Sequence, residues 1–499
     1  MSEQQRAPHL SAEQFRAQAH QVVDWIADYW ESVGERPVLS QVEPGAVAAA
    51  VDGTIPDQPE SLDAVLADVD QHLVPGLTHW QHPRFFAYFP ANSSPAGVLG
   101  DLLSSGIGAQ GMLWATSPAV TELEQVVLDQ LARALGLSDA FCHLRDDGSP
   151  GAGGGVIQDT ASTATFTALL AALHRATGGR ARTEGVEQGR YTVYASTQAH
   201  SSLQKAAMMS GLGERAVRLV DVDPWTQQLD VDRLREAIEA DVAAGRVPVM
   251  VQACVGTTGT GAVDPVAAIG EVTRRHGVWL HVDAAWAGVA ALCPEHAWVN
   301  EGVAELADSY VTNPHKWLLT TFDCSTFWVR DRSALVGALS ILPEYLRNPA
   351  TESGAVVDYR DWHPQLGRRF RALKLWTVLR SYGLSGLRAH LRAGIAQAAR
   401  VAELVDADPR LELAAPPVLG LVSFRLASSD GLGAGRADQL TREVMDRVNA
   451  SGAAYLSHGQ VAGRPFVRWA CGGWRTGAED VEQTWAELDR TLTELLPTR

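Results

Sequence analysis

Apolar residues recur along the chain with two different periods. Near the N-terminus, residues at helical spacing follow a Ser11–Gln14 capping-box pattern, which predicts an amphipathic helix over residues 12–30. From about residue 91 to residue 330, helical segments such as "SPAVTELEQVVLDQLARALG" alternate with short apolar runs such as "VPVMVQACV" and "GVWLHVDAA". This alternation predicts an α/β domain with a largely parallel sheet.

The changes of pattern predict three domains. Residues 1–90 form an N-terminal helical segment whose later part is rich in Pro, Gly and Asp, and residues 91–385 form the large α/β domain. A long helical pattern that begins near residue 370 leads into a small α+β domain, residues 386–499. The stretch 341–365 has no clear period, and a loop of that length in a compact enzyme is more often functional than filler.

Composition narrows the choice of partner and compartment. The 499 residues carry a formal net charge of −17, which argues against nucleic acid or an anionic membrane as a partner. Five scattered cysteines without a CxxC pair predict reduced thiols and a cytoplasmic protein. The first residues contain no apolar run typical of a secretory signal, and no stretch of ~18 apolar residues could span a bilayer.

Two charged residues stand in apolar surroundings. In "TNPHKWLL", Lys316 precedes a tryptophan and two leucines, and a desolvated lysine holds more free amine to condense with a carbonyl. In "HVDAAWAG", Asp283 ends an apolar strand, where ligands bind in open α/β sheets. A surface lysine and a helix-capping aspartate are the alternative interpretations of these two residues taken singly.

Two more segments add polar groups at strand ends. Thr160, Ser162 and Thr163 cluster at the start of a helical stretch, where hydroxyls and free backbone N–H groups suit a phosphate or simply cap the helix. His200 follows the probable strand "RYTVYAS" and is either structural or part of a site. A lysine, a carboxylate, a phosphate cup and a flat imidazole together are what pyridoxal phosphate (PLP) requires.

The ordered motifs "HPRFFAYFP", "SPAVTELE", "QAHSS", "HVDAAWAG", "NPHKWLL", "FDCS" and "LGRRFRALKLW" resemble those of the group II PLP-dependent decarboxylases, and within them the aromatic-L-amino-acid decarboxylases. The resemblance implies the fold-type I, aspartate-aminotransferase-like architecture. It also implies a homodimer with active sites at the interface, in which the N-terminal helical segment covers the partner.

The resemblance implies a role for each matching residue and no metal. Lys316 condenses with the cofactor aldehyde, Asp283 pairs with the ring nitrogen, and His200 stacks on the ring. Tyr345 returns a proton after CO2 leaves. The other cofactor-binding residues are Thr160, Ala161, Ser162, Thr258, Ala285, Asn313 and His315. The substrate-binding residues are Trp80, Tyr88, Phe89, Pro90, Ala91, Gln110, Met112 and Gly367.

Some positions depart from the family pattern. Asp159 replaces a glycine beside the phosphate residues and is expected to point away, while Ala91 replaces a hydroxyl residue.

The expected reaction is decarboxylation of Trp, 5-hydroxy-Trp, Phe, Tyr or DOPA to the arylalkylamine. The alternatives are an aromatic aldehyde synthase, disfavoured because Tyr345 and His200 are both present, and an inactive binding protein, disfavoured because Lys316 and Asp283 are both present.

Overall fold

The computed structural model describes residues 9–51, 53–341, 349–352, 356–428 and 432–496. These residues form two compact units: residues 86–442 with 457–474, and residues 1–85 with 443–456 and 475–499. The two predicted domain boundaries, at residues 90 and 385, remain a prediction. None of the described helices combines the length and apolar character that crossing a membrane requires.

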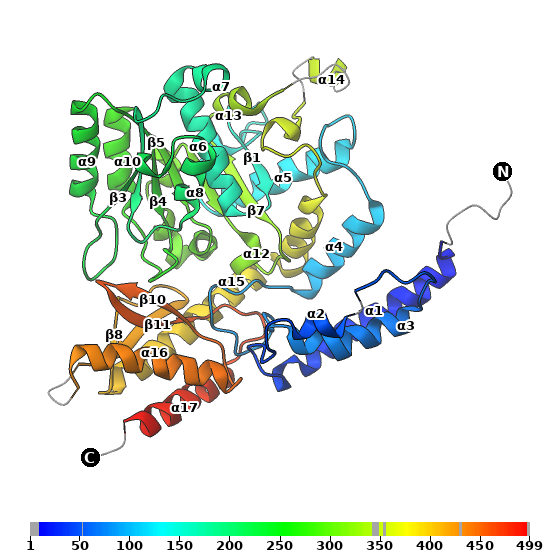
Figure 1. The fold of residues 1–499 in the computed structure, drawn as a ribbon. Coiled ribbons are helices and arrows are strands. Elements are labelled where there is room, and N and C mark those ends of the chain that lie inside the picture. Colours follow the sequence, from blue (N-terminus) through cyan, green and yellow to red (C-terminus); the bar gives the residue numbers. More distant parts are fainter. Residues whose placement is uncertain (1–8, 52, 342–348, 353–355, 429–431, 497–499) are drawn as a thin grey trace. The chain divides into compact units, whose positions relative to one another are not determined.

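The larger unit is built on a seven-stranded sheet (Figure 1), in the order β1-β7-β6-β5-β4-β2-β3. Only β7 runs antiparallel to its neighbours, so the predicted largely parallel α/β sheet is confirmed. The strands are β1 (Gly154–Gln158), β2 (Tyr191–Ser196), β3 (Val217–Val220), β4 (Val247–Cys254), β5 (Trp279–Asp283), β6 (Ser309–Thr312) and β7 (Ser325–Val329).

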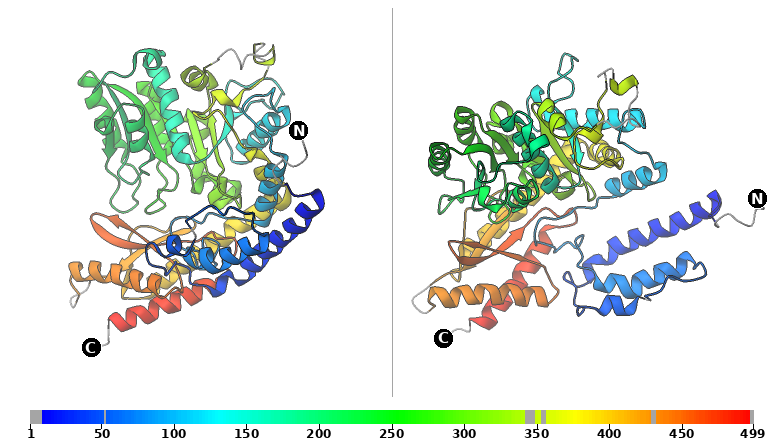
Figure 2. Two further views of the ribbon diagram at one scale, coloured as in Figure 1. Left: turned by 45° about the vertical axis from the view of Figure 1, so that its right-hand side comes forward. Right: turned by 45° about the horizontal axis from the view of Figure 1, so that its top comes forward.

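Helices cover both faces of this sheet, as the views in Figure 2 show. Alternate strand residues explain why: Val251 and Val282 join one buried cluster with α5, α9 and α10, whereas Met250 and Trp279 join another with α6, α8 and α13. The helices of these two clusters are α5 (Pro118–Ala134), α6 (Ala161–Thr177), α8 (Ser202–Met209), α9 (Val231–Ala243), α10 (Val266–His276) and α13 (Arg332–Leu339).

The same unit contains a second, antiparallel sheet of four strands in the order β10-β11-β9-β8. Its strands are β8 (Leu411–Leu413), β9 (Leu421–Leu426), β10 (Ser457–Val461) and β11 (Arg464–Ala470). The predicted long helix is α15 (Arg371–Ala407), which Gly383 interrupts with a non-helical, positive φ of 59°. Shorter helices of this unit are α4 (Pro95–Ile107), α7 (Arg180–Glu184), α11 (Val303–Leu306), α12 (Pro314–Trp317) and α14 (Pro349–Glu352).

The smaller unit contains the predicted N-terminal helix. This helix, α1 (Ala12–Ser32), starts with the Ser11–Gln14 capping box, as the sequence predicts. Gln21 donates a hydrogen bond to Asp63 in α3 (Leu62–Asp68), and Trp25 donates one to Asp70, just beyond the end of α3. No residue of α1 is fully buried within this chain, and Val22, Ile26 and Tyr29 on its apolar face are half-buried. The other helices are α2 (Ala46–Ala50) and α17 (Ala478–Leu495), while α16 (Ala434–Ala450) has residues in both units.

Candidate active site

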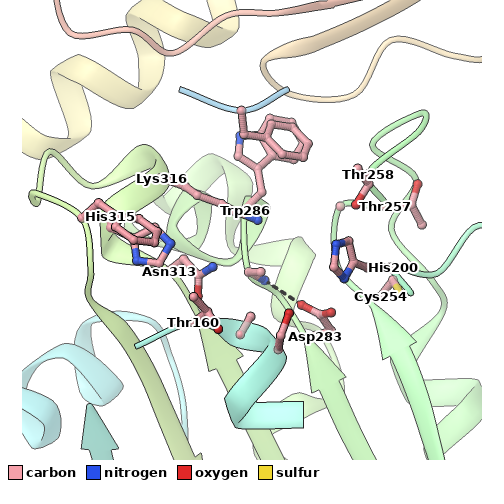
Figure 3. Close-up of a pocket in the computed structure, with 16 residues that line it drawn as sticks. Thr160, His200, Cys254, Thr257, Thr258, Asp283, Trp286, Asn313, His315 and Lys316 are labelled. Atoms are coloured by element: carbon pink, nitrogen blue, oxygen red, sulfur yellow. Dashed lines mark hydrogen bonds between the residues drawn. The ribbon is translucent and has the colours of Figure 1, made fainter. Parts of the chain in front are cut away.

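A pocket with a cavity volume of about 230 Å³ lies where the strands of the large sheet end (Figure 3). β1, β2, β4, β5 and β6 run parallel to one another, so the segments after them meet at one edge of the sheet. Sixteen residues line the cavity: Phe89, Thr160, Ala161, Ser162, His200, Cys254, Gly256, Thr257, Thr258, Asp283, Ala285, Trp286, Asn313, His315, Lys316 and Phe322.

Lys316 lies on the four-residue helix α12, just after β6. The turn is fixed on both sides, because Asn313 donates its backbone N–H to the Ala285 carbonyl and the Asn92 side chain donates to the Lys316 carbonyl. The side chain remains open only in part, towards the cavity. Burial lowers the pKa of the Lys316 ammonium and the Arg468 charge lowers it further, while Asp283 acts in the opposite direction. The balance favours a larger share of free amine than an exposed lysine has.

Asp283 is the last residue of β5, and its carboxylate faces the cavity. Oδ1 accepts a hydrogen bond of 3.2 Å from the Ala285 backbone N–H, and Oδ2 accepts one of 3.2 Å from the Gln252 side chain. Each oxygen keeps a lone pair, so the carboxylate can still accept a hydrogen bond from a ligand.

His200 lies across the cavity from Lys316 and its ring is exposed to it (Figure 3). Nδ1 accepts the backbone N–H of Ser202 at 3.1 Å, which leaves the proton of a neutral ring on Nε2. Desolvation lowers the pKa of His200 and the nearby Lys316 lowers it too, against the opposing effect of Asp283. The neutral ring is therefore favoured at neutral pH, with its Nε2–H free to donate.

Donor groups gather beside Lys316. The His315 Nδ1 accepts the Cys324 backbone N–H at 2.9 Å, so a neutral ring carries its proton on Nε2, and burial lowers its pKa to about 3. Asn313 accepts the Ser325 hydroxyl through Oδ1 at 2.6 Å, which leaves its Nδ2 group to donate. Thr160 caps α6, whose N-terminal backbone N–H groups open towards the cavity. This set of donors suits an anion such as a phosphate.

Aromatic rings form the opposite wall. Phe89 stacks on Trp286 with centroids 4.4 Å apart, and Trp286 stacks on Trp317 at 5.1 Å. The Arg468 guanidinium lies 4.9 Å from the Phe89 centroid, and the Lys316 Nζ lies 5.4 Å from it. A flat apolar side chain can pack against this wall, and the two cations reinforce the position of the Phe89 ring.

The structure brings all the predicted cofactor-binding residues to this one cavity, and Phe89 with them. Asp159 does not line it, in line with its expected orientation, and its carboxylate accepts the Thr160 backbone N–H at 2.7 Å. Tyr345 lies outside the described residues. The other predicted substrate residues are not among those that line the cavity: Trp80, Tyr88, Pro90, Ala91, Gln110, Met112 and Gly367.

Sequence reasoning missed several lining residues. Cys254 ends β4 as Asp283 ends β5, and Gly256 and Thr257 follow it, so the rule of strand ends could have found all three. Trp286 lies in the quoted motif "HVDAAWAG", but its contacts are set by the fold. Phe322 opens the quoted motif "FDCS", but its tilted contact with the His315 ring, at 4.7 Å, is likewise set by the fold.

Comparison with known proteins identifies the family. Residues 44–427 match the pyridoxal-dependent decarboxylase conserved domain. The chain is 44% identical to phenylacetaldehyde synthase of Arabidopsis thaliana and 43% identical to tyrosine decarboxylase 2 of Narcissus pseudonarcissus; each alignment covers 98% of this chain and 97% or 95% of the relative. The crystal structure of Oryza sativa TDC with PLP and tryptamine has a TM-score of 0.94 and 40% identity, covering 98% of this chain and 100% of that one.

The chain therefore belongs to the pyridoxal-dependent decarboxylase family. The group II assignment, the fold-type I architecture, the PLP cofactor and the carboxy-lyase class that the sequence predicts are confirmed. The roles of individual residues remain predictions.

Proposed function

We propose that this protein decarboxylates an aromatic L-amino acid to the arylalkylamine and CO2. One observation carries the proposal: the ten residues predicted to hold PLP, drawn from segments between residues 160 and 316, line a single cavity with an aromatic wall. The relatives include tyrosine and tryptophan decarboxylases, which supports an aromatic substrate.

The residues fit PLP by the chemistry of their donors. The groups beside Lys316, from Asn313, His315 and the start of α6, would hold the phosphate, and Asp283 would hold the ring nitrogen. Lys316 would condense with the aldehyde, since its amine is partly desolvated. PLP, when bound, supplies the electron sink that accepts the electron pair of the breaking bond to the carboxylate.

The chain's own groups account for the other steps. Two N–H groups donate to the oxygens of Asp283 and hold its carboxylate in place, so that it would accept a hydrogen bond from the ring nitrogen. His200 offers a flat neutral ring and an Nε2 proton across the cavity from Lys316. The apolar wall of Phe89 and Trp286 excludes water, and a poorly solvated carboxylate loses its charge more readily as CO2. We assign the return of a proton to the substrate carbon to Tyr345.

A homodimer would complete this site. Gln110 and Gly367 lie close together, since the Arg368 backbone N–H donates to the Gln110 side chain, but neither lines the Lys316 cavity of its own chain. We propose that this wall, with Met112, faces the cavity of a partner subunit. Four exposed apolar residues on α4 support an interface: Leu99, Leu102, Leu103 and Ile107. Sedimentation of the purified protein should then give twice the chain mass, and a monomer with full activity would contradict the proposal.

We also propose a cytoplasmic location. All five cysteines are unpaired and buried, which suits a reducing compartment.

A second candidate activity is oxidative formation of an aromatic aldehyde. It is favoured by the 44% identity to phenylacetaldehyde synthase. It is disfavoured by the presence of both Tyr345 and His200, because family members of that kind lose one of them. The two activities differ in their products, since the oxidative reaction releases ammonia and peroxide.

The most direct test of the site is Lys316→Ala, with Lys316→Arg as a matched variant that keeps the charge. Neither side chain can condense with an aldehyde, because alanine has no amine and the guanidinium of arginine stays protonated. We expect both purified variants to lose the violet absorbance of lysine-bound cofactor and nearly all turnover. Retained absorbance together with substantial activity in either variant would overturn the assignment of Lys316.

A further inference from the structure

Gln252 is a buried amide directly behind Asp283. It lies on β4, beside β5, where Gln252 pairs with His281 and Cys254 pairs with Asp283. Because side chains alternate along strands, the residues at these four positions project from the same face of the sheet, the one covered by α6. Gln252 has no exposed surface and does not line the cavity, so it cannot touch a ligand there.

The interactions of this amide are directed at one group. Its Nε2 donates to the Asp283 Oδ2 at 3.2 Å, while its Oε1 is buried without a partner in the described chain. The Cys254 thiol interacts with the same amide, and His281 is its cross-strand neighbour. Burial of an amide with one half unsatisfied is unfavourable, so packing alone gives no reason for a glutamine beside the apolar Met250 of the same face.

We infer that Gln252 is a positioning residue for Asp283: its N–H holds one carboxylate oxygen and so orients the carboxylate towards the PLP ring nitrogen. The inference rests on the proposed function. With the Ala285 N–H on Oδ1 and the Gln252 N–H on Oδ2, both oxygens are fixed and the carboxylate cannot rotate freely.

The inference predicts a change in the strength of cofactor binding. In Gln252→Leu, which keeps a similar side-chain volume, Asp283 loses the N–H group that holds its Oδ2. The carboxylate is then free to rotate away from the ring nitrogen, so the affinity for PLP should fall. The other charged or titratable groups that act on Asp283 are His200, Cys254, His281 and Lys316, and the substitution leaves all of them in place.

The experiment is a titration of the cofactor-free protein with PLP at pH 7.5, followed by absorbance. We expect the dissociation constant for PLP to rise about tenfold in Gln252→Leu, the effect of one hydrogen bond to a charged group. The matched control is Gln158→Leu, because Gln158 is also a buried strand glutamine, but it donates to the Trp362 carbonyl. Thermal unfolding of each cofactor-free variant establishes that it is folded.

The outcomes separate the two proposals. An unchanged dissociation constant in folded Gln252→Leu, or an equal rise in Gln158→Leu, would overturn the role of Gln252 and leave the proposed function intact. A wild-type protein that binds no PLP at any pH would instead contradict the proposed function.

Discussion

At the scale of single residues, the site depends on how burial shifts protonation. Burial is the largest cause of the lowered pKa of Lys316, His200 and His315, and it acts on each by disfavouring the charged form. The lysine gains nucleophilic character, while the two histidines become neutral donors whose tautomers are set by backbone N–H groups. The same physical effect thus favours a free amine on the lysine and a neutral ring that donates a hydrogen bond on each histidine.

Substrate preference belongs to this scale, through Gly367. A Cβ added at Gly367 would meet only the Gln110 amide, at 3.8 Å, so a serine fits without strain. Serine would fill space on the Gln110–Gly367 wall, which we assign to substrate binding. A contact of methylene size changes the discrimination between two substrates by roughly 1–3 kcal/mol. We expect Gly367→Ser to lower the ratio of kcat/KM for tryptophan over tyrosine. An unchanged or higher ratio would show that Gly367 does not limit the size of the substrate.

The sequence predicted the residues of the site better than their contacts. Asp283 and Lys316 could be found because each interrupts an apolar run at a strand end, where a charge needs a reason. Gln252 and Arg468 could not be found in this way, because each acts on a residue that is distant from it in sequence: Gln252 on Asp283, and Arg468 on Phe89. The Nε2–H tautomers of the histidines likewise depend on local backbone geometry that no residue pattern records.

At the scale of elements, one buried ion pair joins three segments. Arg368 donates to Glu124 on α5 at 2.6 Å and to the Ile157 carbonyl on β1 at 3.1 Å. The Arg368 backbone exchanges hydrogen bonds with Gln110 and Gly111. The ion pair therefore fixes the Gln110–Gly367 wall to the strand that leads into the phosphate donors at Thr160.

We expect Glu124→Gln to destabilise the protein by about 3–5 kcal/mol, because it leaves the Arg368 charge buried without a counter-charge. Glu295→Gln is the matched control, since Glu295 also pairs with an arginine at 2.6 Å, but both side chains are about half exposed. The midpoint of urea unfolding should fall clearly in the first variant and hardly at all in the second. Equal midpoints in the two variants would contradict the structural role of the pair.

The element pattern was predictable where one face of each element is buried. The runs that form β2, β4 and β5 and the helices α1, α5 and α15 follow the predicted positions closely. The order β1-β7-β6-β5-β4-β2-β3 could not be read from periodicity, because the pairing of strands depends on crossovers and not on local residues. The reversed direction of β7 is a case in point, since β7 is buried along its whole length, as its neighbours β1 and β6 are.

At the scale of the whole molecule, buried neutral histidines set the response to acid. Burial lowers the pKa of His143 and His281 to about 4, and of His315 and His363 to about 3, from an ordinary value of 6.5. Below pH 6.5 the unfolded chain binds protons at these four residues and the folded chain does not, so acid favours unfolding. Burial raises the pKa of Asp264 to about 6 and also raises that of Asp129 and Asp361, and these three carboxyls act in the opposite direction. The histidines outnumber them, because burial lowers the pKa of His82 and His390 to about 4 as well.

We therefore expect the protein to be less stable at pH 5 than at pH 7.5. Differential scanning calorimetry of the cofactor-free protein at constant ionic strength measures this directly, and the unfolding temperature should fall on acidification. An equal or higher unfolding temperature at pH 5 would show that these histidines are not held neutral in the folded state.

The central claim concerns the reaction of the whole protein, and product analysis tests it most directly. The purified protein with PLP is incubated with Trp, 5-hydroxy-Trp, Phe, Tyr and DOPA, and CO2, amine, aldehyde and peroxide are measured for each. We predict one arylalkylamine for each CO2 from at least one of these substrates, with no stoichiometric peroxide and no activity in Lys316→Ala. Aldehyde and peroxide in place of the amine would identify the oxidative activity, and no CO2 from any substrate by a protein that binds PLP would contradict the account.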